Sequence, residues 1–277
     1  MNLMKSLNLI ALTDKLQNLP IPNIINLKEC QDRRSWTESE FLRHGVNNIK
    51  VHSYDRYEEG KSIAFVGDPS VVNTTTKGVT SSHLLTIKWW YENTDEEYGL
   101  FFEDDLDYET IQYWNFTLEE YIERCNQWDW GALHMCNVFE YPYDYQNEYI
   151  PMVPKRRELW DHGLQAYAIK REYAEKLIEY YFGEYSDKIH YRMPLGSPVT
   201  TENNILHGFG LVISFPLFNH NVTDFRSKNI YYYNEQASSA FYSYEFLDGW
   251  WEKKGQWLSL DGIFDNERES HKIYGEL

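Results

Sequence analysis

Apolar segments of strand length alternate along this chain with amphipathic segments of helical length. Strands are expected at 21–27, 48–52 and 99–102, and helices at 36–44 and 81–91. Strands that are separated by helices predict a mostly parallel sheet with helices on its faces, because two parallel strands need a long crossover connection. The fold class predicted from this alternation is α/β.

The alternation continues well into the second half of the chain. Further elements are expected at 117–125, 130–135, 165–169, 172–181 and 211–215. Pro216 should end the last of these strands, because proline cannot donate a hydrogen bond to a sheet. Residues 137–163 are rich in Tyr, Pro and charge and have no clear period, so we interpret them as a long functional loop.

Beyond residue 229 the pattern dissolves into sequence rich in Tyr and Trp. We therefore divide the chain into a domain over residues 1–228 and a C-terminal extension over residues 229–277. Trp250, Trp251 and Trp257 are expected to dock this extension onto the domain, because large apolar rings gain free energy from burial. Stacking of their rings on a bound sugar is their alternative role.

The net charge of the chain restricts the classes of ligand that it can bind. A net charge of −17 argues against the phosphate backbone of a nucleic acid as the partner. An anionic small molecule remains compatible with this field where a metal ion and a few arginines offset it. Aromatic residues make up 17% of the chain, and their rings suit either a core or stacking on sugars.

The cysteines and the hydropathy predict a cytoplasmic location. Cys30, Cys125 and Cys136 form no CxxC pair, and an odd number without a framework indicates reduced thiols. Residues 1–20 lack the apolar core of a secretory signal, and no window is long enough for a membrane span. The acidic composition, rich in Asn and Tyr, suits a bacterial cell or a virus-infected host cell.

Four carboxylates follow one of the expected strands within five residues. Glu103, Asp104, Asp105 and Asp107 come directly after the apolar run 99–102. A divalent cation would relieve their repulsion, and oxygen ligands suit Mg²⁺ or Mn²⁺. Ligands of open α/β sheets bind beyond the carboxyl ends of the strands, where these acids would lie. The competing interpretation is a solvated acidic turn.

Four further residues are candidates for the same site. His220 follows the late strand, and a neutral imidazole suits Mn²⁺. Arg33 follows the first strand and could bind a phosphate through two hydrogen bonds. Ser82 and His83 are expected to begin a helix, whose first amides favour anions. The alternatives are a surface histidine, a surface arginine, a helix cap and a packed core histidine.

Several short segments occur along the chain in one order. They are Ile25-Asn26-Leu27 with Asp32-Arg33, Ser82-His83-Leu84, Glu103-Asp104-Asp105-Leu106, Tyr167 before the helix with Ala174, and Pro198-Val199. In this order they resemble glycosyltransferase family 25, which contains bacterial lipooligosaccharide galactosyltransferases and the collagen galactosyltransferases. The resemblance covers roughly residues 22–228.

The resemblance implies a GT-A fold, which is an α/β/α sandwich with a mostly parallel central sheet. It also implies a metal-dependent, inverting glycosyltransferase that uses Mn²⁺ or Mg²⁺. The donor would be a UDP-sugar, with galactose or glucose as the hexose. The acceptor would be a glycan or a hydroxylated side chain, held by the loop over residues 137–163 and the extension.

The resemblance further implies roles for individual residues. The metal ligands would be Asp105, Glu103 and His220. The residues that bind the nucleotide-sugar would be Arg33, Ser82, His83, Glu103 and Asp104.

An inverting transfer also needs a base for the acceptor hydroxyl. Glu202 lies near the Asp that the family often places after its Pro-Val, and Asp161 at the end of the long loop is the second candidate. A surface carboxylate is the commoner fate of such residues.

Two other functions fit the same sequence. One is a metal-dependent phosphohydrolase built on the same acids, although the chain has no second acidic motif of comparable density. The other is a non-catalytic glycan-binding protein that retains the GT-A fold, since a fold alone does not specify an activity.

Overall fold

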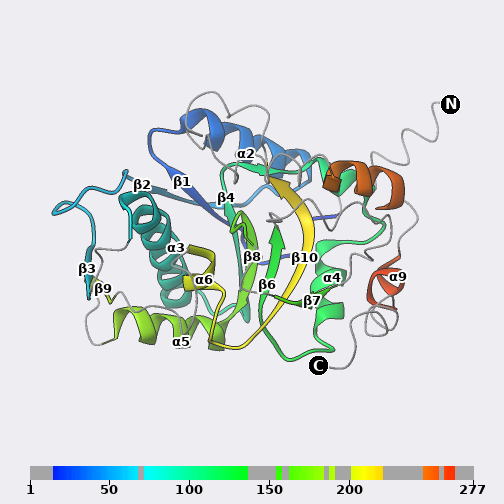
Figure 1. Ribbon diagram of the computed structural model, residues 1–277. Coiled ribbons are helices and arrows are strands. Elements are labelled where there is room, and N and C mark those ends of the chain that lie inside the picture. The colour runs from blue at the N-terminus through cyan, green and yellow to red at the C-terminus, as the bar shows by residue number, and fades with distance from the viewer. Residues whose placement is uncertain are drawn as a thin grey trace.

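The computed structural model has an α/β fold, as the alternation of elements predicted (Figure 1). It describes residues 15–67, 72–136, 154–157, 162–183, 187–190, 201–220, 246–255 and 259–265. The strands are β1 (Asn23–Leu27), β2 (Lys50–Tyr54), β3 (Ala64–Val66), β4 (Tyr98–Glu103), β5 (Leu106–Asp107), β6 (Trp130–Cys136), β7 (Lys155–Arg156), β8 (Ala166–Lys170), β9 (Lys188–His190) and β10 (Leu211–His220). The helices are α2 (Gln31–Arg43), α3 (Thr74–Asn93), the 3₁₀ helix η2 (Glu109–Tyr113), α4 (Leu118–Cys125), α5 (Arg171–Phe182), α6 (Thr201–Ile205) and α9 (Leu260–Asp265).

The main sheet has the order β2-β1-β4-β8-β6-β10-β5. The short strand β7 also pairs with β10, in antiparallel direction. Strands β1, β2 and β4 are parallel, and β6 and β10 are parallel to each other. Strand β8 runs antiparallel to both of its neighbours, β4 and β6. The sheet is therefore mixed, and β1, β4, β6 and β10 still share one direction. Strands β3 and β9 form a separate two-stranded sheet.

Helices cover both faces of the main sheet (Figure 1). Alternate strand residues supply the two cores. On β4, Leu100 and Phe102 point into the core that contains Phe41 of α2 and Tyr121 of α4. Phe101 points the other way, into the core formed with α3 and α5. The two-residue period of a strand produces this division, since successive side chains lie on opposite faces.

Helix α3 begins at Thr74, seven residues before the expected start at Ser81. Asn73 is its N-cap, and its side-chain oxygen accepts a hydrogen bond from the Thr76 amide at 2.8 Å. The β-branched residues of the first turn concealed this start. Gly78 did so as well, because glycine lowers helix propensity. A Cβ at Gly78 would lie 3.1 Å from the Cβ of Tyr57, so the close approach of that residue explains the glycine.

The prediction that Pro216 ends the last strand was wrong, because β10 continues to His220. The pairing of β10 with β6 shifts register between Ser214 and Phe218. Pro216 lies at this irregularity, so the strand continues beyond it. The continuation matters for the site, because it carries His220 to the end of the strand. By contrast, the predicted capping box of α4 is confirmed: Thr117 and Glu120 exchange hydrogen bonds.

Residues 246–254 of the C-terminal extension are helical and lie against the domain. Trp251 is fully buried, and its indole N–H donates a hydrogen bond to the carbonyl of Pro216 at 3.1 Å. Its ring packs edge-on against Phe215 and tilted against Trp114. Trp257 lies outside the described residues. Among the helices that the structure describes, none is long and apolar enough to cross a membrane.

Candidate functional site

The carboxyl ends of β1, β4 and β10 meet at one edge of the sheet. Ile25 of β1 pairs with Glu103, the last residue of β4. The direction of β10 is the same, since it is parallel to β6, and β6 and β4 both run antiparallel to β8. This edge therefore collects the residues that follow each of these strands, as expected for a ligand site of an α/β sheet.

A short strand pair brings Asp105 to His220. After β4 the chain turns at Asp104 and Asp105, and β5 then runs antiparallel to the end of β10. In this pairing Leu106, the residue after Asp105 in the chain, lies opposite His220. The Nε2 atom of His220 lies 3.4 Å from Oδ2 of Asp105. Two residues that are 115 positions apart in sequence thus face each other.

Asp104 is buried and fully engaged within the protein. Its Oδ2 accepts a hydrogen bond from the side-chain amide of Asn26 at 2.5 Å. Its Oδ1 forms an ion pair with Arg33 at 2.9 Å, and its backbone carbonyl accepts a hydrogen bond from Thr37 at 3.1 Å. Asp104 therefore ties the turn to β1 and α2, and this role differs from the predicted contact with a nucleotide-sugar.

Arg33 bridges the two adjacent aspartates. Besides the contact with Asp104, its Nη1 lies 3.5 Å from Oδ2 of Asp105. Burial and the neighbouring charge of Asp105 raise the pKa of Asp104. Burial also opposes ionisation of Asp105, but the hydrogen bond from His220 and the charges of His220 and Arg33 lower its pKa. Asp105 is therefore the more acidic of the two aspartates, and Arg33 contacts both carboxylates.

The ring of His220 responds to the same charges. Burial disfavours its protonated form, but the hydrogen bond and the charge of Asp105, with the charge of Glu103, raise the pKa of His220 above its usual value. The influence of Glu103 on His220 indicates that the first acid of the cluster also belongs to this site.

Glu103 itself contacts His83 of α3. The Nε2 atom of His83 lies 2.9 Å from Oε1 of Glu103, and Nδ1 lies 2.9 Å from the hydroxyl of Tyr167. His83 therefore contacts Glu103 from the interior of the protein. It cannot contact a ligand at the acid cluster, because its side chain is only 1% exposed. No role for Tyr167 was predicted from the sequence. The available signal was its hydroxyl among the apolar residues Ala166, Ala168 and Ile169 of β8.

Ser82 does not lie where the sequence suggested. It was expected to begin a helix, but it lies inside α3 and donates a hydrogen bond to the carbonyl of Val79 at 2.8 Å. It therefore offers no helix-end amides to an anion. Asp107, the last acid of the run, is buried and accepts a hydrogen bond from the Glu109 amide at 2.8 Å in the turn that precedes η2.

The side chains of the two candidate bases, Asp161 and Glu202, lie outside the described part of the structure. Asp161 and most of the loop over residues 137–163 lie outside the described residues, as does Pro198-Val199. The backbone of Glu202 belongs to α6, but its side chain is outside the described part of the structure. The first residue of α6 contacts α3, where the hydroxyls of Thr201 and Thr80 lie 3.2 Å apart.

Asp105 and His220 fit the requirements of a divalent cation. Both Oδ1 of Asp105 and Nδ1 of His220 are buried, and neither has a hydrogen-bond partner among the described residues. Within that same part of the chain, no group of three or more His, Cys, Asp or Glu side chains is arranged to hold a metal ion. Mg²⁺ sites commonly use one or two protein carboxylates and take their other ligands from water and substrate phosphates. Two protein ligands therefore suffice where a diphosphate completes the shell.

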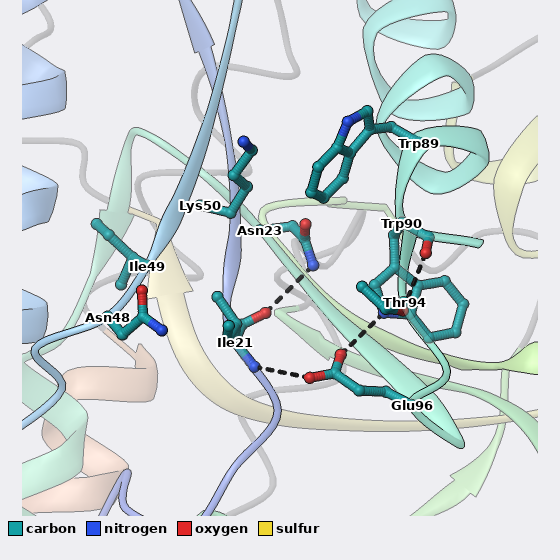
Figure 2. Close-up of a pocket in the computed structure, with 9 residues that line it drawn as sticks. All are labelled: Ile21, Asn23, Asn48, Ile49, Lys50, Trp89, Trp90, Thr94 and Glu96. Atoms are coloured by element: carbon teal, nitrogen blue, oxygen red, sulfur yellow. Dashed lines mark hydrogen bonds between the residues drawn. The ribbon is translucent and has the colours of Figure 1, made fainter. Parts of the chain in front are cut away.

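A separate small pocket lies at the opposite edge of the sheet (Figure 2). It has a volume of about 100 Å³ and is lined in part by Asn23 and Lys50, the first residues of β1 and β2. Trp89 and Trp90 of α3 form another wall, and Glu96 accepts hydrogen bonds from the Trp90 indole and the Ile21 amide. Its lining is mainly apolar, and it shares no residue with the acid cluster.

Comparison with known proteins adds no relative to this picture. No family model matches the chain, and no curated protein matches it.

Proposed function

We propose that this protein is a metal-dependent, inverting glycosyltransferase of the GT-A type that uses a UDP-sugar, with galactose or glucose as the transferred hexose. The observation that carries this proposal is the convergence of Arg33, Asp105 and His220 at the carboxyl edge of the sheet. Together they offer one ionised carboxylate, one imidazole and one guanidinium to a ligand that brings its own negative charge. The ordered motifs that resemble family 25 support a nucleotide-sugar as that ligand.

The roles of the three residues follow from their contacts. Asp105 and His220 would hold Mn²⁺ or Mg²⁺ in place of the 3.4 Å hydrogen bond that joins their facing Oδ2 and Nε2 atoms. When bound, the cation supplies positive charge to the diphosphate and to the leaving nucleotide. Arg33 lies beside Asp105 and would pair with a phosphate oxygen, because its guanidinium suits that geometry.

The transfer also needs a base that takes the proton of the acceptor hydroxyl. Glu202 and Asp161 remain our candidates. Glu202 belongs to α6, whose first residue, Thr201, contacts Thr80 of α3. The acceptor would be a glycan or a hydroxylated side chain. A cytoplasmic location is also part of the proposal, because Cys30, Cys125 and Cys136 are all free thiols.

A screen of nucleotide-sugars tests this function. With Mn²⁺ present, we expect UDP to be released slowly from UDP-galactose or UDP-glucose by transfer to water, and faster with a suitable glycan acceptor. Chelation of the metal should stop the release. ADP-glucose and GDP-mannose serve as controls for recognition of the nucleotide.

Three results would contradict the proposal. Release of phosphate from a simple phosphate ester, at a rate that matches any sugar transfer, would indicate a phosphohydrolase. Binding to a glycan array without turnover of any donor would indicate a glycan-binding protein. Equal turnover of all nucleotide-sugars without a metal would exclude the site described above.

A further inference from the structure

A chain of hydrogen bonds passes from the centre of the sheet to the acid cluster. It starts at Tyr167 on β8, continues through His83 on α3 and ends at Glu103 on β4. We propose that Tyr167 and His83 are positioning residues that fix the carboxylate of Glu103 for binding of the nucleotide-sugar. This inference rests on the proposed function for the identity of the ligand.

The burial of the three side chains gives the chain a direction. Tyr167 is 0% exposed, and the side chains of His83 and Glu103 are 1% and 20% exposed. The first two residues therefore have no access to a ligand, whereas Glu103 reaches the surface at the carboxyl edge of the sheet. What happens at Tyr167 can affect a ligand only through the residues that follow it.

The protonation of the chain follows from its chemistry. Burial, with the charge of Glu103, raises the pKa of Tyr167 well above its usual value, so its hydroxyl keeps its proton. With a neutral imidazole between them, that O–H donates to Nδ1 of His83, and the Nε2–H donates to Glu103. The hydroxyl thus selects the tautomer of His83 that can bind a carboxylate.

Packing holds both inner rings in place. Tyr167 stacks on Phe101, its partner in the β4–β8 pairing, with 5.1 Å between ring centroids and 13° between planes. It also stacks on His83 at 5.7 Å and 28°. A side chain whose rotamer is fixed in this way can fix the next group in turn.

Glu103 needs such support because of its neighbours. It lies close enough to His220 to affect the pKa of that ring, and Asp104 and Asp105 follow it directly in the chain. Without the hydrogen bond from His83, repulsion from these carboxylates would turn the Glu103 side chain toward water. The hydrogen bond from His83 holds it at the edge where the donor sugar nucleotide would bind.

The substitution Tyr167→Phe removes only the hydroxyl that starts the chain. We expect it to weaken the affinity for UDP in the presence of Mn²⁺ about fivefold, the usual effect of one hydrogen bond. Tyr181→Phe is the matched control. Tyr181 is equally buried, lies on α5 far from the acids in the sequence, and donates a hydrogen bond to Asn204 at 2.9 Å. It should lose stability to a similar degree while its UDP affinity stays within about twofold of the original.

Coupling to Glu103 separates positioning from general damage. In a Glu103→Ala background, Tyr167→Phe should have no further effect on UDP affinity, because the group that it positions is gone. His83→Gln, which retains an N–H donor, should bind UDP better than His83→Phe. Additive effects of the Tyr167 and Glu103 substitutions, or unchanged affinity in Tyr167→Phe, would overturn the proposal.

The tautomer of His83 tests the chain without any ligand. Nitrogen NMR of the full-length protein should show the Nε2–H form, and Tyr167→Phe should shift the ring toward the other tautomer, with Tyr181→Phe as the control. An Nδ1–H or doubly protonated ring in the original protein would overturn the proposed chain. If the tautomer is as expected but UDP does not bind, the proposed function fails while the chain of hydrogen bonds stands.

Discussion

Asp105→Asn is expected to reduce the affinity for UDP in the presence of Mn²⁺ by about 100-fold, which is about 2.7 kcal/mol. The substitution preserves the shape of the side chain and removes its charge. The pKa of Asp105 lies below its usual range, so the side chain is charged, and its carboxylate is the group assigned to the cation. A neutral amide oxygen at that position binds a divalent cation far more weakly. Calorimetric titration of UDP at a fixed Mn²⁺ concentration measures the change.

Asp107→Asn is the matched control for this experiment. It changes the same residue type two positions away, and its remaining side-chain oxygen can still accept the hydrogen bond from the Glu109 amide. Its affinity for UDP should stay within about threefold of the original, less than the usual effect of one hydrogen bond. If Asp105→Asn and Asp107→Asn bind UDP equally well, the assignment of Asp105 is wrong.

Trp251→Ala should lower the free energy of unfolding by about 3–5 kcal/mol, the usual range for removal of a buried tryptophan. The side chain is fully buried against Trp114 and Phe215, and its N–H bonds to the carbonyl of Pro216. Its loss would open a cavity between the extension and the sheet and leave that carbonyl without its partner. Urea denaturation provides the measurement.

Trp250→Ala is the neighbouring control. Trp250 packs edge-on against Trp251 but is partly exposed, so its removal should lower the stability by about 1–2 kcal/mol. A loss below about 1 kcal/mol for Trp251→Ala would mean that the extension contributes little to the folded domain.

Periodicity and end signals in the sequence located most elements of the sheet. The apolar run around Phe101 predicted a buried strand, and the Thr117 and Glu120 pair marked the start of α4. The direction of β8 was beyond such reasoning, because an apolar strand has the same pattern in either direction. The early start of α3 was also hidden, since Gly78 is explained by Tyr57, a contact that no local pattern reveals.

The candidate site was predicted unevenly for a similar reason. A run of carboxylates after an apolar strand identified the correct edge of the sheet, and chain order identified His220 as its partner. The division of roles within the run depended on tertiary contacts. Asn26 and Arg33 occupy both oxygens of Asp104, whereas Asp105 keeps one oxygen without a hydrogen bond in the described structure. Alternation along a strand cannot distinguish these two neighbours.

Titration of UDP into the protein with and without Mn²⁺ is the direct test of metal-dependent nucleotide binding. We expect saturable binding that strengthens at least about tenfold when the metal is present, because Asp105 and His220 provide only part of a coordination shell that the diphosphate completes. UDP that fails to bind, or that binds equally well after the metal is removed, would contradict the proposed function.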